Sequence, residues 1–410
     1  MRSFFACLGF LCLINSSRAQ FKATGRELVD SLCSPYFFGR GYVNEGCSRA
    51  AYFLANRLSA YGLDPLFNEF FQEFPLTVNT FPKEFHVQLD KRNLKVGRDF
   101  QPHWQSPSAK GSYRLVYLDS LNGTLPVIKS NEALAIPKNW FAKAQKNKAE
   151  LIEELSYLYP LVLEGGEQLL WSVGHDQFKH PVIEVINPLF WGAEKVKMRY
   201  QAVIEPNYFC NNVCAVVKGT QYPDSFLFLT AHYDHLGGMG QETYLSGAND
   251  NASGTAMLLS LAKYFNENPP KYSIAFVAFA AEEAGLVGSK YFVERSGIDL
   301  KKIKFLFNLD LMGTGATGAT VVNATLFPLQ FDQLKKVNDN GHYLSVINPR
   351  GEAANSDHYW FTKAGVPSFF MYLQDPAYTA YHNIHDRPQD LPLSRFDETC
   401  KLIIDFLNSF

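Results

Sequence analysis

The chain has 410 residues, a net charge of −2, and hydrophobic and aromatic contents of 47% and 15%. This length allows one large domain or two ordinary ones, and so much apolar material argues against extended disorder. The balanced charge gives no support for a nucleic-acid partner, whose phosphates require a basic surface.

The first 19 residues have the pattern of a signal peptide. Arg2 supplies a positive start, residues 4–14 are apolar, and Ser17-Arg18-Ala19 has small residues at its outer positions, as cleavage after Ala19 needs. The apolar run is too short to span a bilayer, and no later run is long enough. We therefore expect an exported protein, secreted or periplasmic, with no membrane anchor after signal removal.

Removal of the signal leaves an odd number of cysteines. Export permits disulfides. Cys210 and Cys214 can pair only if Asn211-Asn212 makes a turn, because an extended strand would hold their Cα atoms roughly 13 Å apart. For this pair we expect a disulfide ahead of free thiols, and metal binding last. The remaining cysteines are Cys33, Cys47, Cys210, Cys214 and Cys400.

Residues 20–80 are predicted to be an N-terminal helical part of the same domain as residues 201–410. The segment 46–58 has Ala50, Leu54 and Leu58 on one face, which is typical of an amphipathic helix. Gly62 is the expected C-terminal stop of that helix.

Residues 81–200 are predicted to form an inserted, smaller β-rich domain. Short apolar runs such as 85–89 and 113–118 alternate there with turn residues. One charged helical stretch is expected over residues 142–157.

Residues 201–410 are predicted to be an α/β domain, a three-layer mixed β-sheet flanked by helices. Continuous apolar runs indicate strands buried on both faces, and the segments 253–266 and 288–295 between them are predicted helices. Sites in such sheets form at the carboxyl ends of the strands. The predicted strands are 213–218, 226–230, 273–279, 304–309 and 367–373.

Candidate metal ligands follow four of these strands. His232 and Asp234 follow the first of the four, and their spacing places both side chains on one face if the segment is extended. His235 is a competing ligand that we rank lower. Glu282-Glu283 follows the next strand, where a metal would relieve the repulsion between two carboxylates.

The remaining candidates are acidic groups and histidines in the same region. Asp250 precedes an apolar helical stripe, where it can cap the helix as well as bind metal. Asp310 follows an apolar run and needs a partner. Either His382 or His385 could bind metal, and Asp386 could orient an imidazole.

The charges suit two divalent cations. Asp250, Glu283 and Asp310 bring three negative charges, which two cations and a bridging hydroxide neutralise. Nitrogen and oxygen ligands without a thiolate favour zinc.

These motifs resemble those of the M28 family of zinc metallopeptidases, the aminopeptidase Y/Aeromonas type. The segment 81–200 resembles a protease-associated domain by its position and β character, and Phe38-Gly39-Arg40 resembles the family's N-terminal part. The matching motifs are His232-x-Asp234, Asp250-Asn-Ala-Ser-Gly, Ala281-Glu-Glu-Ala-Gly, Asn308-Leu-Asp-x-Met-Gly and Tyr381-His.

The resemblance implies a role for each residue. His232 and Asp310 would bind one zinc ion, Glu283 and His382 the other, and Asp250 both. Glu282 would be the general base, and Asp234 a partner of His232. The resemblance also implies a cis peptide after Asp250, and a structural rather than a ligand role for His358.

One motif departs from the family pattern. The family usually reads Tyr-His-Thr-Pro, whereas Asn383-Ile384 follows His382 here and His385 adds an alternative ligand.

The implied reaction is hydrolysis of N-terminal residues from peptides through a metal-bridging water. The alternatives are a glutaminyl cyclase-like transferase with a single zinc, a carboxypeptidase or dipeptidase on the same scaffold, and a non-catalytic binding protein.

Overall fold

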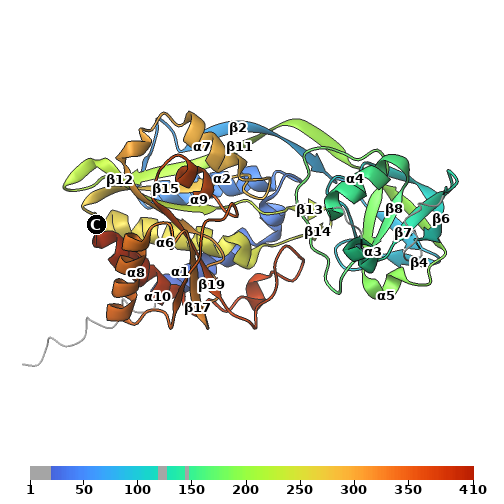
Figure 1. Ribbon diagram of the computed structural model, residues 1–410. Coiled ribbons are helices and arrows are strands. Elements are labelled where there is room, and N and C mark those ends of the chain that lie inside the picture. Colours follow the sequence, from blue (N-terminus) through green and yellow to red (C-terminus); the bar gives the residue numbers. More distant parts are fainter. Residues whose placement is uncertain (1–19, 119–126, 144–146) are drawn as a thin grey trace, which may run out of the picture.

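A nine-stranded mixed sheet forms the larger part of the computed structural model, which describes residues 20–118, 127–143 and 147–410 (Figure 1). The expected signal peptide therefore lies outside the described residues. The strand order is β1 (Asp64–Pro65), β11 (Val203–Val217), β15 (Tyr272–Phe279), β12 (Tyr222–His232), β16 (Ile303–Leu309), β19 (Ser368–Gln374), β17 (Gly318–Val322) and β18 (Ile347–Pro349), and β2 (Phe71–Thr80) pairs with β11.

The centre of this sheet is parallel. β15, β12, β16 and β19 pair in parallel, whereas β11 joins β15 and β17 joins β19 in antiparallel fashion. The central strands are apolar along their whole length because both faces are buried. Leu227 and Leu229 pack into one hydrophobic cluster and Phe228, between them, into another.

Helices cover both faces of the sheet and complete three layers, which confirms the predicted fold class. One face packs against α1 (Gln20–Leu32), α2 (Gly46–Ala60), α6 (Gly254–Glu267), α8 (Pro328–Gly341) and α10 (Phe396–Asn408), and the other against α7 (Val287–Arg295) and α9 (His358–Lys363). None of the helices in the described ranges combines the length and the apolar character needed to cross a membrane.

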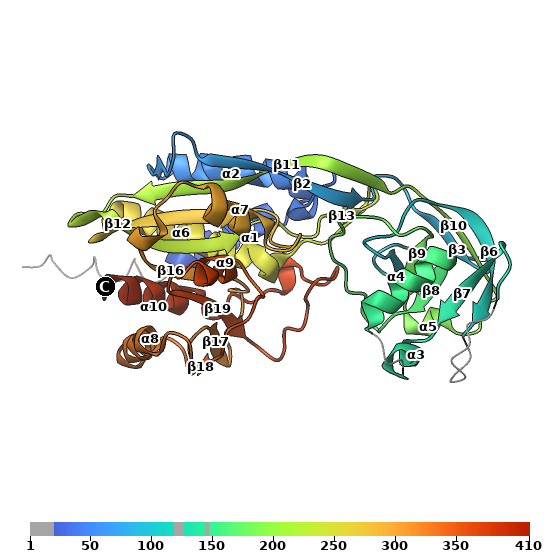
Figure 2. The ribbon, with the colours of Figure 1, turned by 45° about the horizontal axis from the view of Figure 1, so that its top comes forward.

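A second, eight-stranded sheet lies at the other end of the molecule, beyond the hairpin of β13 (Gly238–Met239) and β14 (Thr243–Tyr244) (Figures 1 and 2). Its strand order is β4 (Arg92–Leu94), β3 (His86–Leu89), β10 (Lys195–Tyr200), β6 (Ala109–Tyr117), β7 (Glu132–Ile136), β8 (Leu161–Glu164), β9 (Val182–Val185) and β5 (Phe100–Pro102).

The region of the second sheet contains more helix than the one stretch expected, and part of its sheet is parallel. β6, β7, β8 and β9 pair in parallel, and α3 (Lys138–Lys143) and α4 (Lys148–Leu158) pack on one face. The charged helix expected over 142–157 corresponds to α4, which begins after Asn147, whose side chain accepts a hydrogen bond from the Ala149 N–H at 2.8 Å. A third short helix is α5 (Asn187–Phe190).

The expected disulfide between Cys210 and Cys214 is wrong. Both residues lie on the continuous strand β11, so Asn211 and Asn212 make no turn, and the two side chains pack in different hydrophobic clusters. All five cysteines of the described residues are buried free thiols. The sulfur of Cys210 instead lies 3.9 Å from that of Cys47 on α2.

Candidate metal centre

The candidate ligands meet at the carboxyl ends of the parallel strands. His232 is the last residue of β12, Asp310 directly follows β16, and Glu282 and Glu283 follow β15. These three strands are neighbours in the sheet, so their ends lie at one edge. Asp250 approaches from a helical turn, Ala248–Ser253, that leads into α6.

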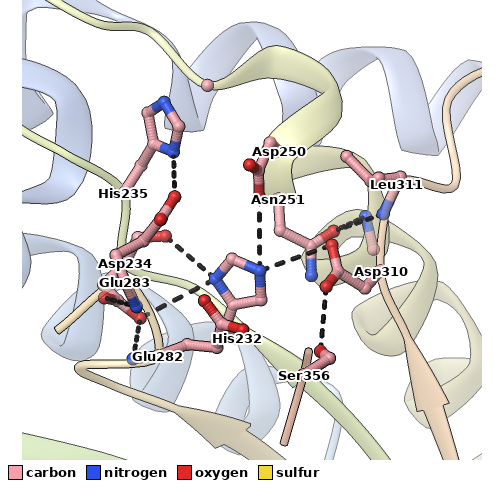
Figure 3. Close-up of polar contacts among 12 residues, drawn as sticks. His232, Asp234, His235, Asp250, Asn251, Glu282, Glu283, Asp310, Leu311 and Ser356 are labelled. Carbon is pink, nitrogen blue, oxygen red and sulfur yellow. Dashed lines mark hydrogen bonds and ion pairs between the residues drawn. The ribbon is translucent and has the colours of Figure 1, made fainter. Parts of the chain in front are cut away.

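The first cluster is centred on His232. Its Nε2 lies 3.3 Å from Asp250 Oδ1 and 3.4 Å from Asp310 Oδ1 (Figure 3). Glu282 offers a third carboxylate, because ligand atoms of His232, Glu282 and Asp310 all lie within 4.8 Å of one another. His232 and Asp310 are buried, and Glu282 is partly buried.

The second cluster is centred on His382, in the loop after β19. Its Nε2 lies 3.0 Å from Asp250 Oδ2 and 3.1 Å from Glu283 Oε2. The two oxygens of Asp250 therefore face two different histidines. A carboxylate in this position can offer one oxygen atom to each side of the site.

Two further histidines compete with these ligands in the sequence. His235 Nδ1 lies 2.7 Å from Glu283 Oε1, and His235, Asp250 and Glu283 have ligand atoms within 4.8 Å of one another. Because Glu283 presents its other oxygen to His382, we interpret His235 as the residue that orients this carboxylate. His385 is exposed, and among the described residues its ring forms no ion pair with a carboxylate, whereas that of His382 forms two.

The donors fit a metal of the zinc type. Ligand atoms about 2.0–2.1 Å from a tetrahedral ion would lie about 3.3 Å apart, close to the separations around His232 and His382. Among the described residues, no Lys or Arg nitrogen lies within 4.0 Å of the carboxylate oxygens of Asp250, Glu283 or Asp310. The buried Asp310 Oδ1 also has no hydrogen-bond partner there.

The pKa shifts of His232 and His382 also indicate that positive charge is favoured at this site. Burial alone would lower the pKa of His382, but Glu283 and Asp250 raise it to about 11. Burial likewise opposes protonation of His232, and Glu282, Asp310 and Asp250 nevertheless raise its pKa well above the ordinary value. A bound cation would supply this charge instead of the proton and leave the imidazoles neutral, as ligation requires.

Glu282 differs from Glu283 in its electrostatic surroundings. Burial raises the pKa of Glu282 well above the ordinary value, and the charges of Glu283, Asp357 and Asp310 add to this shift. Burial also acts on Glu283, but the positive charge of His382 and the hydrogen bonds from His235 and His382 lower its pKa to about 2. The adjacent pair thus contains one carboxylate suited to bind a cation and one suited to carry a proton.

Asp234 holds the backbone of the glutamate pair. Its Oδ1 accepts a hydrogen bond from the Glu282 N–H at 3.2 Å and its Oδ2 accepts one from the Glu283 N–H at 3.3 Å. Its Oδ1 is 3.8 Å from His232 Nδ1, which lies closer to the Asp234 backbone oxygen, at 3.2 Å. The carboxylate therefore contacts the loop after β15 more closely than it contacts the imidazole.

A chain of polar side chains fixes Asp310. Thr230 donates to Asn308, Asn308 donates to Ser356, and the Ser356 hydroxyl donates to Asp310 Oδ2 at 2.9 Å. Asp310 Oδ1 is thereby turned toward His232. Ser356 lies two residues before His358, for which the resemblance implied a structural role, and His358 is fully buried outside the candidate ligand groups.

Asn251 ties the turn that carries Asp250 to the segment that carries Asp310. Its side chain donates to the Leu309 carbonyl at 2.9 Å and accepts from the Gly254 and Leu311 N–H groups. A Cβ at Gly254 would lie 2.4 Å from the Leu309 carbonyl oxygen, so glycine permits this close approach. The peptide between Asp250 and Asn251 is cis, as the resemblance implied.

Two buried charged residues outside the predicted ligand set also shape the site. Asp386 accepts hydrogen bonds from the Asn249 and Asp250 N–H groups at 2.8 and 3.0 Å, so it holds the Asp250 turn rather than an imidazole, and that expectation is corrected. Arg40, fully buried, donates to the carbonyls of Tyr233, Ser246 and Gly247, among others. The resemblance included Arg40, but no local pattern revealed its contacts, because they span roughly 200 residues.

The second sheet's region contacts the His382 loop. The Trp171 backbone N–H donates to the His382 carbonyl at 3.0 Å, and the Asn383 side chain donates to Gln168 Oε1 at 3.1 Å. Asn383, which departs from the family motif, is buried by these contacts. The residue that replaces the family's threonine thus contacts the second sheet's region through its side chain.

Part of the chain is similar to known peptidases. Residues 212–407 match the model of Peptidase family M28. Aminopeptidase YwaD of Bacillus subtilis is 28% identical over 207 residues, a segment that covers 48% of this chain and 44% of the relative. The chain thus spans less than half the length of that curated relative.

Solved structures share the fold. A zinc aminopeptidase from Bacillus subtilis superposes with a TM-score of 0.71 at 17% identity, covering 94% of each chain. A glutaminyl cyclase from Bacteroides thetaiotaomicron superposes less well, with a TM-score of 0.51 at 13% identity over 95% of this chain and 97% of that one. Residues 212–407 are thus similar to peptidase family M28, and the solved structures show the fold alone.

Proposed function

We propose that this chain is an aminopeptidase that uses two zinc ions to hydrolyse the peptide bond next to a free amino terminus. The observation that carries the proposal is the position of Asp250, whose two oxygens face the separate imidazoles of His232 and His382. A carboxylate between two cation positions is a feature of two-metal hydrolases. The relatives from Bacillus subtilis that are named as aminopeptidases support the same reaction class.

The cluster geometry supports a division of the ligands between two ions. His232 and Asp310 would hold one ion, Glu283 and His382 would hold the other, and Asp250 would contact both. When bound, such ions lower the pKa of a water molecule and polarise the carbonyl of the scissile bond.

The protein residues would then move the proton. Glu282 is the general base in this proposal, since its raised pKa suits a group that accepts a proton and releases it again. It takes a proton from the attacking water and delivers it to the leaving amine. Asp234 keeps the backbone of Glu282 in place for both steps.

The test combines zinc counting with substrates that differ only at their amino terminus. Purified protein should contain close to two zinc ions per chain, cleave aminoacyl anilides, and lose this activity on dialysis against a chelator. N-acetylated forms of the same substrates should resist cleavage. Zinc added back after dialysis should restore the rate.

Three outcomes would contradict the proposal. One zinc ion per chain with cyclisation of N-terminal glutamine would indicate a glutaminyl cyclase. Release of C-terminal residues from blocked peptides would indicate a carboxypeptidase. Undetectable metal and no turnover would indicate a binding protein.

We also propose that the enzyme is exported after cleavage behind Ala19. The charged start, the apolar run and the small residues near Ala19 support this proposal. N-terminal sequencing of protein recovered outside the cytoplasm should begin at Gln20. An N-terminus that retains Met1 would contradict it.

A further inference from the structure

The candidate metal centre opens into a cavity of about 220 Å³ with two chemically different sides. His232, Asp250, Glu282 and Asp310 form the side that carries the candidate ligands. This volume lies below the range of about 300–1,000 Å³ that is usual for sites of drug-sized ligands, so it suits one residue of a substrate. The remaining lining residues are Leu311, Arg350, Asn355, Phe370, Tyr372 and Tyr381.

Arg350 brings a positive charge to this second side. It directly follows the edge strand β18, and its backbone N–H donates to the Val321 carbonyl at 2.9 Å, which anchors its main chain on the sheet. Its Nη1 lies 3.4 Å from the Tyr372 hydroxyl. Within the described ranges no carboxylate lies within 4.0 Å of its guanidinium, which leaves its charge available to a ligand.

Other residues on this side of the cavity can also donate hydrogen bonds to an anion. Asn355 can donate from its amide, Tyr372 can donate from its hydroxyl, and a guanidinium offers two parallel N–H groups that match a carboxylate. Arg is suited to bind planar anions in this way, whereas Lys acts as a point charge.

The charge of the loaded site also favours an anion. This step rests on the proposed function. Two zinc ions and a hydroxide would neutralise Asp250, Glu283 and Asp310, so that the charges left in the cavity would be the negative one of Glu282 and the positive one of Arg350. A substrate carboxylate placed there would gain a charge-assisted hydrogen bond without competition from those ligands.

We propose that Arg350, with Asn355 and Tyr372, binds a carboxylate of the substrate close to the scissile bond. Two sources have this chemistry: the side chain of an N-terminal Glu or Asp residue, and the C-terminal carboxylate of a dipeptide. The enzyme would then select acidic N-terminal residues or short peptides rather than large apolar N-terminal residues.

Paired substrates separate the two sources. The first pair is the anilides of glutamate and glutamine, which differ in one charge on the side chain. The second pair is the dipeptide Leu-Ala and its C-terminal amide. We expect the acidic member of at least one pair to have the higher kcat/KM, with the difference mainly in KM, and the pair concerned identifies the source.

Substitution of Arg350 should abolish that selectivity. In Arg350→Met the acid-to-amide ratio of kcat/KM should fall by about 10- to 100-fold, as expected for the loss of a hydrogen bond to a charged group. Arg350→Lys should restore only part of the ratio. Arg92→Met, an exposed arginine on β4 in the second sheet, is the matched control and should leave the ratio unchanged.

The result that overturns the proposal is equal selectivity of the wild type and Arg350→Met in both pairs. If neither protein cleaves any substrate, the proposed function fails, and calorimetric titration of zinc-loaded protein with L-glutamate, L-glutamine, Leu-Ala and its amide decides the binding question alone. At least tenfold tighter binding of an acidic ligand than of its amide, lost in Arg350→Met, supports the proposal. Equal affinities in both pairs refute it.

Discussion

Buried charge is treated differently in the two parts of the molecule. In the second sheet's region, Asp99 is buried and paired with Arg98 at 2.7 Å, and Glu132 is paired with Arg114. Around the ends of β12, β15 and β16, five carboxylates gather with histidines and, among the described residues, without a Lys or Arg: those of Asp234, Asp250, Glu282, Glu283 and Asp310. Because an uncompensated buried charge is costly, the second arrangement indicates where a cation belongs.

The two parts are not independent, since they meet at the loop of His382. Trp171 and Gln168 come from the second region and bond to His382 and Asn383. The second sheet's region, in which the buried charges are paired locally, thus supports the candidate ligand His382 of the other part.

The largest expected effect comes from Glu282, the cluster carboxylate that we assign to proton transfer. Glu282→Gln should lower kcat by about 10²- to 10⁴-fold, because an amide cannot accept the proton. Zinc content, measured by atomic emission, should stay at the wild-type value. A loss of zinc would instead make Glu282 a ligand, in agreement with its position near His232 and Asp310.

Asp234→Asn tests the residue that holds the backbone of Glu282 and Glu283 in place. The amide can accept only through one oxygen, so either the Glu282 or the Glu283 N–H loses its partner. We expect a 10- to 100-fold loss in kcat/KM or in zinc affinity, as is typical for groups that position ligands. Asp299→Asn, at a surface cap bonded to the Lys301 N–H, is the control and should behave as wild type. Wild-type kinetics and zinc affinity in Asp234→Asn would refute the assigned role.

Ser106→Ala tests a satisfied polar site in the second region. The Ser106 hydroxyl hydrogen-bonds with Tyr200 at 2.8 Å and accepts from the Val182 N–H at 2.9 Å, all in a buried setting. Its removal should lower the free energy of unfolding by about 1–3 kcal/mol and leave kcat unchanged. The control is Ser112→Ala on an exposed position of β6, which should cost less than about 0.5 kcal/mol. A fall in kcat would show that this site is coupled to the metal centre.

The smallest effect concerns His103, a histidine without a carboxylate partner. It stacks on Trp104 at 4.0 Å, accepts a hydrogen bond from the Gln105 N–H, and its burial lowers its pKa to about 3. The unfolded chain, with a pKa near 6.5, therefore takes up a proton first as the pH falls, and the folded state loses stability between about pH 6.5 and 3.

His103→Phe should remove that part of the acid sensitivity. Between pH 7 and 4.5, the wild type should lose about 1–2 kcal/mol more of its free energy of unfolding than the variant loses. Denaturant titrations at the two pH values measure this difference. Equal losses would show that His103 carries a proton in the folded state.

Local patterns predicted the elements that depend on local order. The strands before His232, Glu282 and Asp310 are continuous apolar runs because both faces of the sheet are covered, and this pattern is visible in the chain. The rule for strand ends then predicted that these side chains would lie together.

Other contacts could not be predicted because they depend on residues that are distant in the sequence. Asp386 bonds to the Asp250 turn across 136 residues, and Ser356 to Asp310 across 46. The predicted disulfide between Cys210 and Cys214 was wrong for a related reason. The course of β11 through Cys210 is set by its partners β2 and β15. No local signal indicates such a partner.

Arg40 has a consequence for the order in which the molecule matures. Its guanidinium joins an N-terminal turn to the segments at Tyr233 and Gly247, while Arg26 on α1 donates to the carbonyls of Pro388 and Leu391 near the C-terminus. Segments around residues 26–40 and 382–391 therefore both support the candidate ligand cluster. A nascent chain that has not yet reached residue 382 lacks the histidine at that position, so the candidate centre can close only after that residue has left the ribosome.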